Sequence, residues 1–323
     1  MNRPAGFPDF FIIGAPRCGT TALSRYLSRH PHICFSRPKE THYFAQLSEL
    51  PSENDLKRDY IDRYFGHRTN ENRLSGEGSV SYLHLPGPIE QVMHFNPDAK
   101  FIAMVRNPLT VLPSYHQKML FLLQEDEPDF SRAWALQSAR ARGEYIPKTC
   151  LDPLLLNYGE GVKLGAQIER LFNTVGRDRA HVIVFDDFAA DTLSVYRELL
   201  DFLELDDDGQ TEFERRFESQ MYRYHWLQRL LFIPVTKGGK AMDSLQRRKR
   251  KYRKDGTRKP GLIKWITQLN KVAVRPAPLT PQLATIIREL LHDDVQLLGQ
   301  LLQRDLGFWL ATDAADKPSK SSA

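Results

Sequence analysis

The sequence predicts an α/β fold in which a central parallel sheet of about five strands is flanked by helices. Short apolar runs alternate with amphipathic helical patterns along the chain, and this alternation favours parallel strands joined by right-handed crossovers. Most of the runs are continuously apolar, as expected where helices cover both faces of a sheet. The expected strands are residues 9–14, 32–36, 75–81, 100–105 and 181–185.

Helical patterns fill the segments between and after these strands. In residues 20–30, Leu23, Tyr26 and Leu27 recur at helical spacing and predict one apolar face. The third strand is the weakest of the five, because only Val80 in it is strongly apolar. The other expected helices are residues 109–123, 165–175 and 194–204, and a long C-terminal helix at 281–304.

Bulk composition indicates a folded protein with one domain over residues 1–311 and a disordered tail at 312–323. The chain is 41% hydrophobic and 26% charged, which is ordinary for a globular protein. Its three cysteines form neither an even set nor a metal-binding spacing, and this favours reduced thiols. The N-terminus lacks a signal-peptide pattern and its apolar run is short, so we expect a cytoplasmic protein without a transmembrane segment.

The strongest single feature is the turn from Gly14 to Thr21, between the first strand and the first helix. The apolar run leads into Gly-x4-Gly-Thr-Thr and then directly into the amphipathic helix. Glycines let the backbone wrap closely, and successive N–H groups converge on an anion at the positive end of the helix. The turn is therefore predicted to bind phosphate.

This loop departs from the form found in nucleoside triphosphatases. Thr20 stands where those proteins have the lysine that reaches the β- and γ-phosphates. Arg17, inside the loop, supplies a positive charge instead, and an arginine can bind a terminal phosphate through two parallel hydrogen bonds. A second candidate phosphate ligand is Arg106, which follows the strand at 100–105 and points into the crevice where open α/β sheets bind ligands.

These segments resemble the PAPS-dependent sulfotransferase family, in its carbohydrate, heparan-sulfate-like and bacterial branches. The resemblance rests on residues 15–21 (APRCGTT), on Arg106 with Ser114, and on residues 37–44 (RPKETHYF) and 76–83 (GEGSVSYL). It implies a three-layer P-loop-type fold. It also implies 3′-phosphoadenosine 5′-phosphosulfate (PAPS) as co-substrate, 3′,5′-bisphosphoadenosine (PAP) as product, and no required metal.

The resemblance assigns the nucleotide contacts to two groups of residues. Arg106 and Ser114 are expected to bind the 3′-phosphate. The loop residues expected to hold the 5′-phosphosulfate are Arg17, Cys18, Gly19, Thr20 and Thr21.

The resemblance also makes Glu40 the expected general base. His42 and Glu77 are weaker alternatives for this role. His42 lies two residues from Glu40, so on a strand both side chains would face the same side. A positioned base of this kind is typically worth about 10²–10⁴-fold in rate.

Lys39 and Arg17 are the cations expected to stabilise the transferring group. Gly78 stands where the matching family segment has a lysine, and Lys39 is the residue expected to take over its role. Hydroxyls and amines on carbohydrates, lipids and small metabolites all remain open as acceptors, and the oligomeric state is also open.

Positive charge is concentrated in a predicted basic loop at about 236–261. Of the formal net charge of +5, residues Lys237 to Lys259 carry +9, which leaves −4 for the rest of the chain. Three roles stay open for this segment: a contact with the 3′-phosphate, to which the sequence Lys237-Gly238-Gly239 could contribute, attraction of an anionic acceptor or membrane surface, or a solvated loop.

Two other functions are alternatives. Residues 182–186 (VIVFD) look like a Walker-B strand, which would suit a P-loop kinase or NTPase, but the missing loop lysine argues against it. The basic run at 247–254 would suit a nucleic-acid-binding protein. Only Tyr252 interleaves this run, which weakens a stacking mode, so we expect no nucleic-acid partner.

Overall fold

The computed structural model describes residues 3–68, 73–150, 152–214, 219–224, 227, 265 and 268–311. The predicted basic loop at 236–261 and the predicted disordered tail at 312–323 lie outside these residues. The chain groups into two compact units: Met1–Val111, Gly161–Arg216 and Thr285–Ala323 form the first, and Leu112–Glu160 and Phe217–Ala284 form the second. The single domain over residues 1–311 stays a prediction.

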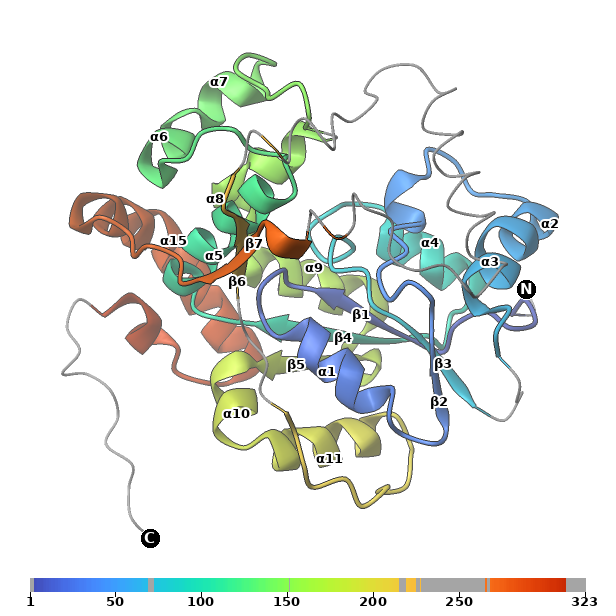
Figure 1. Ribbon diagram of the computed structural model, residues 1–323. Helices are drawn as coiled ribbons and strands as arrows, with labels where there is room; N and C mark the ends of the chain where they lie inside the picture. The colour runs from blue at the N-terminus through green and yellow to red at the C-terminus, as the bar shows by residue number, and fades with distance from the viewer. Residues whose placement is uncertain are drawn as a thin grey trace, which may run out of the picture. The chain divides into compact units, whose positions relative to one another are not determined.

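The first unit is built on a five-stranded parallel sheet in the order β2-β3-β1-β4-β5 (Figure 1). The predicted α/β fold with a central parallel sheet is therefore confirmed. All five residues of β1 are buried, because the central strand is covered on both faces. The strands are β1 (Phe10–Gly14), β2 (Ile33–Phe35), β3 (Leu74–Glu77), β4 (Lys100–Val105) and β5 (Ala180–Val184).

The third strand is shorter than predicted. We expected it to run over residues 75–81, but β3 ends at Glu77. The backbone N–H of Gly78 donates to the carbonyl oxygen of Lys39, at 3.0 Å, rather than to a neighbouring strand. The segment that follows β3 therefore belongs to the loops at the edge of the sheet.

Helices cover both faces of this sheet, as Figure 1 shows. On α1, Leu23, Tyr26 and Leu27 are buried, which confirms the predicted apolar face. Burying a side chain of this size contributes about 1.5–3 kcal/mol. One face carries α1 (Thr20–Leu27), α10 (Phe185–Ala190) and α11 (Thr192–Phe202), and the other carries α4 (Pro88–Phe95) and α9 (Leu164–Val175).

One long helix and several short elements complete the first unit. The long helix α15 (Pro281–Leu302) begins in the second unit and contributes its residues from Thr285 onward to the first. The remaining elements are η1 (Phe44–Gln46), α2 (Glu53–Leu56), η2 (Lys57–Ile61), α3 (Asp62–Phe65), η4 (Arg177–Arg179) and η5 (Gly307–Leu310).

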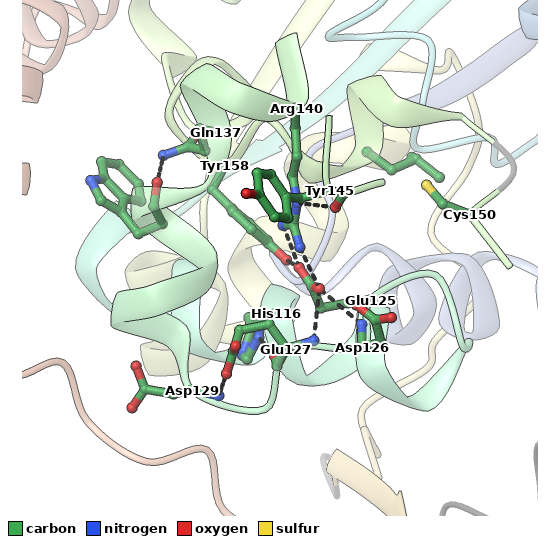
Figure 2. Close-up of polar contacts among 12 residues, drawn as sticks. His116, Glu125, Asp126, Glu127, Asp129, Gln137, Arg140, Tyr145, Cys150 and Tyr158 are labelled. Carbon is green, nitrogen blue, oxygen red and sulfur yellow. Dashed lines mark hydrogen bonds and ion pairs between the residues drawn. The ribbon is translucent and has the colours of Figure 1, made fainter. Parts of the chain in front are cut away.

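The second unit has a buried ion pair at its centre (Figure 2). Two nitrogens of Arg140 donate to the two oxygens of Glu125, at 2.6 and 2.7 Å, and Tyr158 Oη donates to the same carboxylate at 2.7 Å. The elements around it are α5 (Pro108–Phe121), α6 (Phe130–Ala135), α7 (Gln137–Ala141), η3 (Pro153–Leu156) and α8 (Tyr158–Gly161). The antiparallel pair β6 (Ser219–Tyr222) and β7 (Lys271–Val274) belongs to the same unit and was not predicted.

Candidate active site

The predicted site residues of the first unit follow the carboxyl ends of its strands. The phosphate loop follows β1, the segment with Glu40 follows β2, and Arg106 follows β4. Parallel strands place these ends at one edge of the sheet, which is where open α/β sheets bind ligands.

The loop after β1 has the backbone of an anion site. Gly19 is the N-cap of α1 and has φ 100°, a left-handed conformation that glycine adopts without strain. A Cβ on Gly19 would lie 3.1 Å from Met104 and 3.2 Å from Phe185, so there is little room for a side chain. No described side chain caps the start of α1, and its first turn holds no acidic residue. The N–H groups of this turn are therefore suited to an anionic ligand.

One arginine of this loop, Arg17, lies close to Arg106, which follows β4. Nη1 of Arg106 donates to the backbone oxygen of Arg17 at 3.4 Å, and its guanidinium lies 4.1 Å from the ring centre of Phe185. Burial lowers the pKa of both guanidinium groups, and the charge of Arg106 further lowers the pKa of Arg17. Two partly buried cations held this close would be stabilised by an anion between them.

The other residues predicted to bind the nucleotide differ in their burial and in the unit to which they belong. Cys18 is buried in the loop, and burial raises the pKa of its thiol to about 12. Thr20 is buried at the first position of α1, whereas Thr21 is exposed. Ser114 is buried on α5 in the second unit.

Lys39, Glu40 and His42 form a charged cluster. Nζ of Lys39 lies 3.1 Å from Oε1 of Glu40 and 3.4 Å from the hydroxyl of Thr20. Nε2 of His42 lies 3.6 Å from the other oxygen of Glu40. The structure thus brings together the three residues predicted to be catalytic, and Lys39 connects them to the first turn of α1.

The partners of Glu40 keep its carboxylate ionised. Burial alone would raise the pKa of Glu40, but the hydrogen bond from His42 and the charge of Lys39 lower it to about 2. The pKa of Lys39 is itself lowered by burial, although Glu40 and Glu77 oppose this effect. The cluster can therefore hold Glu40 as an anionic base next to the partly desolvated ammonium group of Lys39.

The predicted reason for the proximity of His42 and Glu40 was wrong. We expected the two side chains to share one face of a strand, but β2 ends at Phe35 and His42 has φ 50° in a loop. His42 instead faces Glu40 because its Nδ1 is hydrogen bonded to the hydroxyl of Ser81, at 2.8 Å.

Glu77 is poorly suited to the alternative role of base. Its side chain is 0% exposed and accepts hydrogen bonds from the hydroxyls of Tyr60, Ser79 and Tyr82. An acceptor substrate could not reach either oxygen without displacing these donors.

Several residues at this edge were missed by the sequence analysis. Phe185 supports Arg106, and Ser79 and Ser81 contact the segment that carries Glu40. The indole N–H of Trp309 donates to Asp186 at 2.9 Å. The signals for these residues were the end of the predicted strand at 181–185, for Phe185 and Asp186, and the matching family segment at 76–83, for Ser79 and Ser81.

Comparisons with known proteins identify the family of this chain. A family model described as a sulfotransferase domain matches residues 7–254. The membrane-associated sulfotransferase kil1 of Dictyostelium discoideum is 30% identical over 124 residues, which span 38% of this chain and 25% of that protein. The bifunctional heparan sulfate N-deacetylase/N-sulfotransferase 1 of Caenorhabditis elegans is 28% identical over 113 residues, 35% of this chain and 13% of that protein.

The matched segments thus cover a quarter or less of these two relatives. Among solved structures, a sulfotransferase from Alicyclobacillus acidocaldarius has a TM-score of 0.63 at 24% identity and covers 94% of this chain and 99% of its own, which shows a shared fold. In the described part of the chain, no helix has the length and apolar character needed to cross a bilayer. With the family model matched over most of its length, the chain belongs to the sulfotransferase domain family.

Proposed function

We propose that this chain transfers the sulfuryl group of PAPS to a hydroxyl or amine of an acceptor, by in-line displacement with Glu40 as general base. The contacts of Lys39 carry this proposal. Its ammonium group lies 3.1 Å from the candidate base and 3.4 Å from Thr20, in the helix turn suited to phosphate. One cation thus connects the place where a proton would be taken to the place where the donor would be bound.

The chemistry of the transfer sets the task of each residue. The acceptor oxygen or nitrogen forms a bond to sulfur while its proton passes to the Glu40 carboxylate. The bond between sulfur and the bridging oxygen breaks, and its electron pair stays on the 5′-phosphate of PAP. Charge spreads over the sulfuryl oxygens and the leaving phosphate, where Lys39, Arg17 and the N–H groups of the first turn of α1 can stabilise it.

The low pKa of Glu40 fits this task if Lys39 exchanges partners. In the free protein Lys39 is bonded to Glu40 and helps to lower the pKa of that carboxyl to about 2. Once Lys39 turns to the sulfuryl oxygens, Glu40 loses that partner and becomes a stronger base. Glu40 would thus become more basic at the step that needs it.

Nucleotide recognition would be shared between Arg17 with its loop and Arg106. By the family resemblance, Arg106 and Ser114 would bind the 3′-phosphate, and no metal would be required. The acceptor would be a carbohydrate or another molecule with a hydroxyl or amine; the named function of the Caenorhabditis relative supports a carbohydrate chain. The cytoplasmic location stays a prediction.

The kinase alternative is weakened by the partners of two acids after β5. In a Walker-B arrangement Asp186 would serve a magnesium ion, but its carboxylate accepts the indole N–H of Trp309. The next residue, Asp187, is paired with Arg304, with one N–O distance of 2.9 Å. Both carboxylates thus have partners within the protein.

The first experiment compares thermal stability with PAP and with ATP plus magnesium. A ligand at about a hundred times its Kd adds roughly 2.7 kcal/mol, which raises the Tm by several degrees. We expect PAP alone to stabilise the chain. A shift with ATP and magnesium but none with PAP would assign the chain to the kinase alternative.

Two substitutions separate binding from chemistry. Glu40→Gln should bind PAP as the unchanged protein does but lose most of its turnover, by about 10²-fold or more. Arg106→Ala should weaken PAP binding by about 2 kcal/mol, because a charge-assisted contact is removed. Full turnover of Glu40→Gln would contradict its role as base, and unchanged PAP affinity of Arg106→Ala would contradict a phosphate contact.

A further inference from the structure

The loop after β3 is hydrogen bonded to the backbone of the segment that carries Lys39, Glu40 and His42. The N–H of Gly78 donates to the carbonyl oxygen of Lys39 at 3.0 Å. The hydroxyl oxygen of Ser79 accepts from the backbone N–H groups of Thr41, at 3.1 Å, and His42, at 2.8 Å. Bonds from one short stretch therefore fix the backbone on both sides of Glu40.

A buried carboxylate determines how Ser79 makes these bonds. The Ser79 hydroxyl donates its single proton to Glu77, which also accepts from Tyr60 at 2.8 Å and Tyr82 at 3.1 Å. With its proton directed at Glu77, the oxygen of Ser79 presents its lone pairs to the two amides. Glu77 thus acts on the catalytic segment through Ser79.

These bonds hold a backbone conformation that a histidine rarely adopts. His42 has φ 50°, in the left-handed region, which persists only where surrounding contacts impose it. Its N–H is bound by Ser79 and its Nδ1 by Ser81, both 2.8 Å away. This conformation places Nε2 beside Glu40.

Gly78 determines the path of Lys39. A Cβ on Gly78 would lie 2.4 Å from Cε and 3.0 Å from Cγ of Lys39, so the Lys39 side chain would have to shift to make room for it. The absence of a side chain at position 78 leaves the space through which Lys39 reaches Glu40 and Thr20.

We propose that Glu77, Gly78 and Ser79 form a positioning template for Lys39, Glu40 and His42. Ser79, oriented by Glu77, sets the backbone that carries Glu40 and His42. Gly78 leaves room for the ammonium group of Lys39. The template rests on the proposed function, because it positions the residues that would perform the transfer.

The first test compares Ser79→Ala with Ser75→Ala. Ser75 is buried within β3 and Ser79 is buried two residues after it, but Oγ of Ser75 makes no hydrogen bond within the described residues. Turnover is measured as PAP release from PAPS, with de-N-sulfated heparin as the probe acceptor because it offers both hydroxyls and amines. We expect Ser79→Ala to lower kcat by about 10–100-fold with PAP affinity unchanged, and Ser75→Ala to change neither. Wild-type kcat in Ser79→Ala would overturn the template.

The second test is a double-mutant cycle between positions 78 and 39. Gly78→Ala should displace Lys39 and lower kcat about as much as Lys39→Met does. The two changes together should cost no more than either alone, because both remove the same ammonium group from the site. Losses that multiply would show that Gly78 does not act through Lys39.

Hydrogen exchange separates failure of the template from failure of the proposed function. In the unliganded protein, Ser79→Ala should speed exchange at the amides of Thr41 and His42, and Ser75→Ala should not. If the wild-type protein neither binds PAP nor releases PAP from PAPS, the proposed function is wrong. The template then has no catalytic role either. Unchanged exchange at both amides would refute the template even in an active enzyme.

Discussion

The two units each bury a glutamate, but they stabilise it in different ways. Glu125 in the second unit accepts from the two terminal nitrogens of Arg140, from Tyr158, and from the backbone N–H groups of Asp126 and Glu127 (Figure 2). Among the described residues, the donors to Glu77 in the first unit are hydroxyl groups. Both side chains are fully buried, so burial raises the pKa of each. Hydrogen bonds from Arg140, from the backbone of Glu127 and from Tyr158 together more than offset this for Glu125, whose pKa is lowered, whereas the pKa of Glu77 stays raised.

The difference indicates two uses for a buried carboxylate. The charge of Glu125 is satisfied by Arg140, by the hydroxyl of Tyr158, and by the backbone N–H groups of the two residues that follow it in the chain. Glu77 accepts the hydroxyl proton of Ser79, and the oxygen of Ser79 accepts from the backbone N–H groups of Thr41 and His42, just after Glu40. The first carboxylate is paired with a cation and orients only the backbone of its own turn, whereas the second, without a paired cation among the described residues, orients a segment far from it in sequence.

The largest effect is expected from breaking the internal pair. Arg140→Met leaves the Glu125 carboxylate buried without its cation, and should lower the free energy of unfolding by about 3–5 kcal/mol. Arg142→Met is the matched control, since its pair with Glu144 is exposed and should contribute less than about 1 kcal/mol. Urea unfolding of both variants measures the difference. Equal losses would mean that the buried pair is no more important than the exposed one.

A smaller contrast is expected when each carboxylate becomes an amide. Glu125→Gln should cost about 3 kcal/mol, because the charge of Arg140 stays buried without its anion. Glu77→Gln should cost no more than about 1 kcal/mol, because its neutral hydroxyl partners can rotate to donate or accept. Unfolding by urea at neutral pH compares the two variants. A larger loss for Glu77→Gln would reverse the comparison.

The smallest effect is the opposite pH dependence of these two substitutions. The folded-state pKa of Glu125 is lowered, so its contribution to stability is present above the ordinary value and is lost as the pH falls through the folded-state pKa. The pKa of Glu77 is raised, so the protein loses stability relative to Glu77→Gln as the pH rises from the ordinary value through the raised one. Each slope is at most about 1.4 kcal/mol per pH unit. Unfolding measured across mildly acidic pH tests the signs, and slopes of the same sign would contradict this account.

The sequence predicted the sheet and the phosphate loop well, because both depend on short-range patterns. Apolar runs predicted four of the five strands, the third having only a weak apolar signal, and the glycine spacing before α1 predicted the loop. Lys39, Glu40 and His42 were identified through family resemblance, and their mutual contacts are present. Their geometry was not predictable, since the left-handed backbone of His42 depends on Ser79 and Ser81, far away in sequence.

The centre of the second unit was missed for a related reason. Charged residues are expected at the surface, so nothing in the sequence indicates that Glu125 and Arg140 are buried together. The short strands β6 and β7 have no long apolar run, and they pair across a separation of about fifty residues, from Ser219 to Val274. Contacts of this range depend on tertiary structure and leave little local signal.

The contacts of Trp309 have a practical consequence for anyone who expresses part of this chain. The family match stops at residue 254, yet the carbonyl oxygen of Trp309 accepts from Asn107 and its indole donates to Asp186. Asn107 is the residue next to Arg106. A fragment trimmed to the matched region would therefore lose both of these contacts close to Arg106, and its failure to bind nucleotide would not count against the function proposed for the whole chain. A working boundary must include Trp309, more than fifty residues beyond the end of the recognised family match.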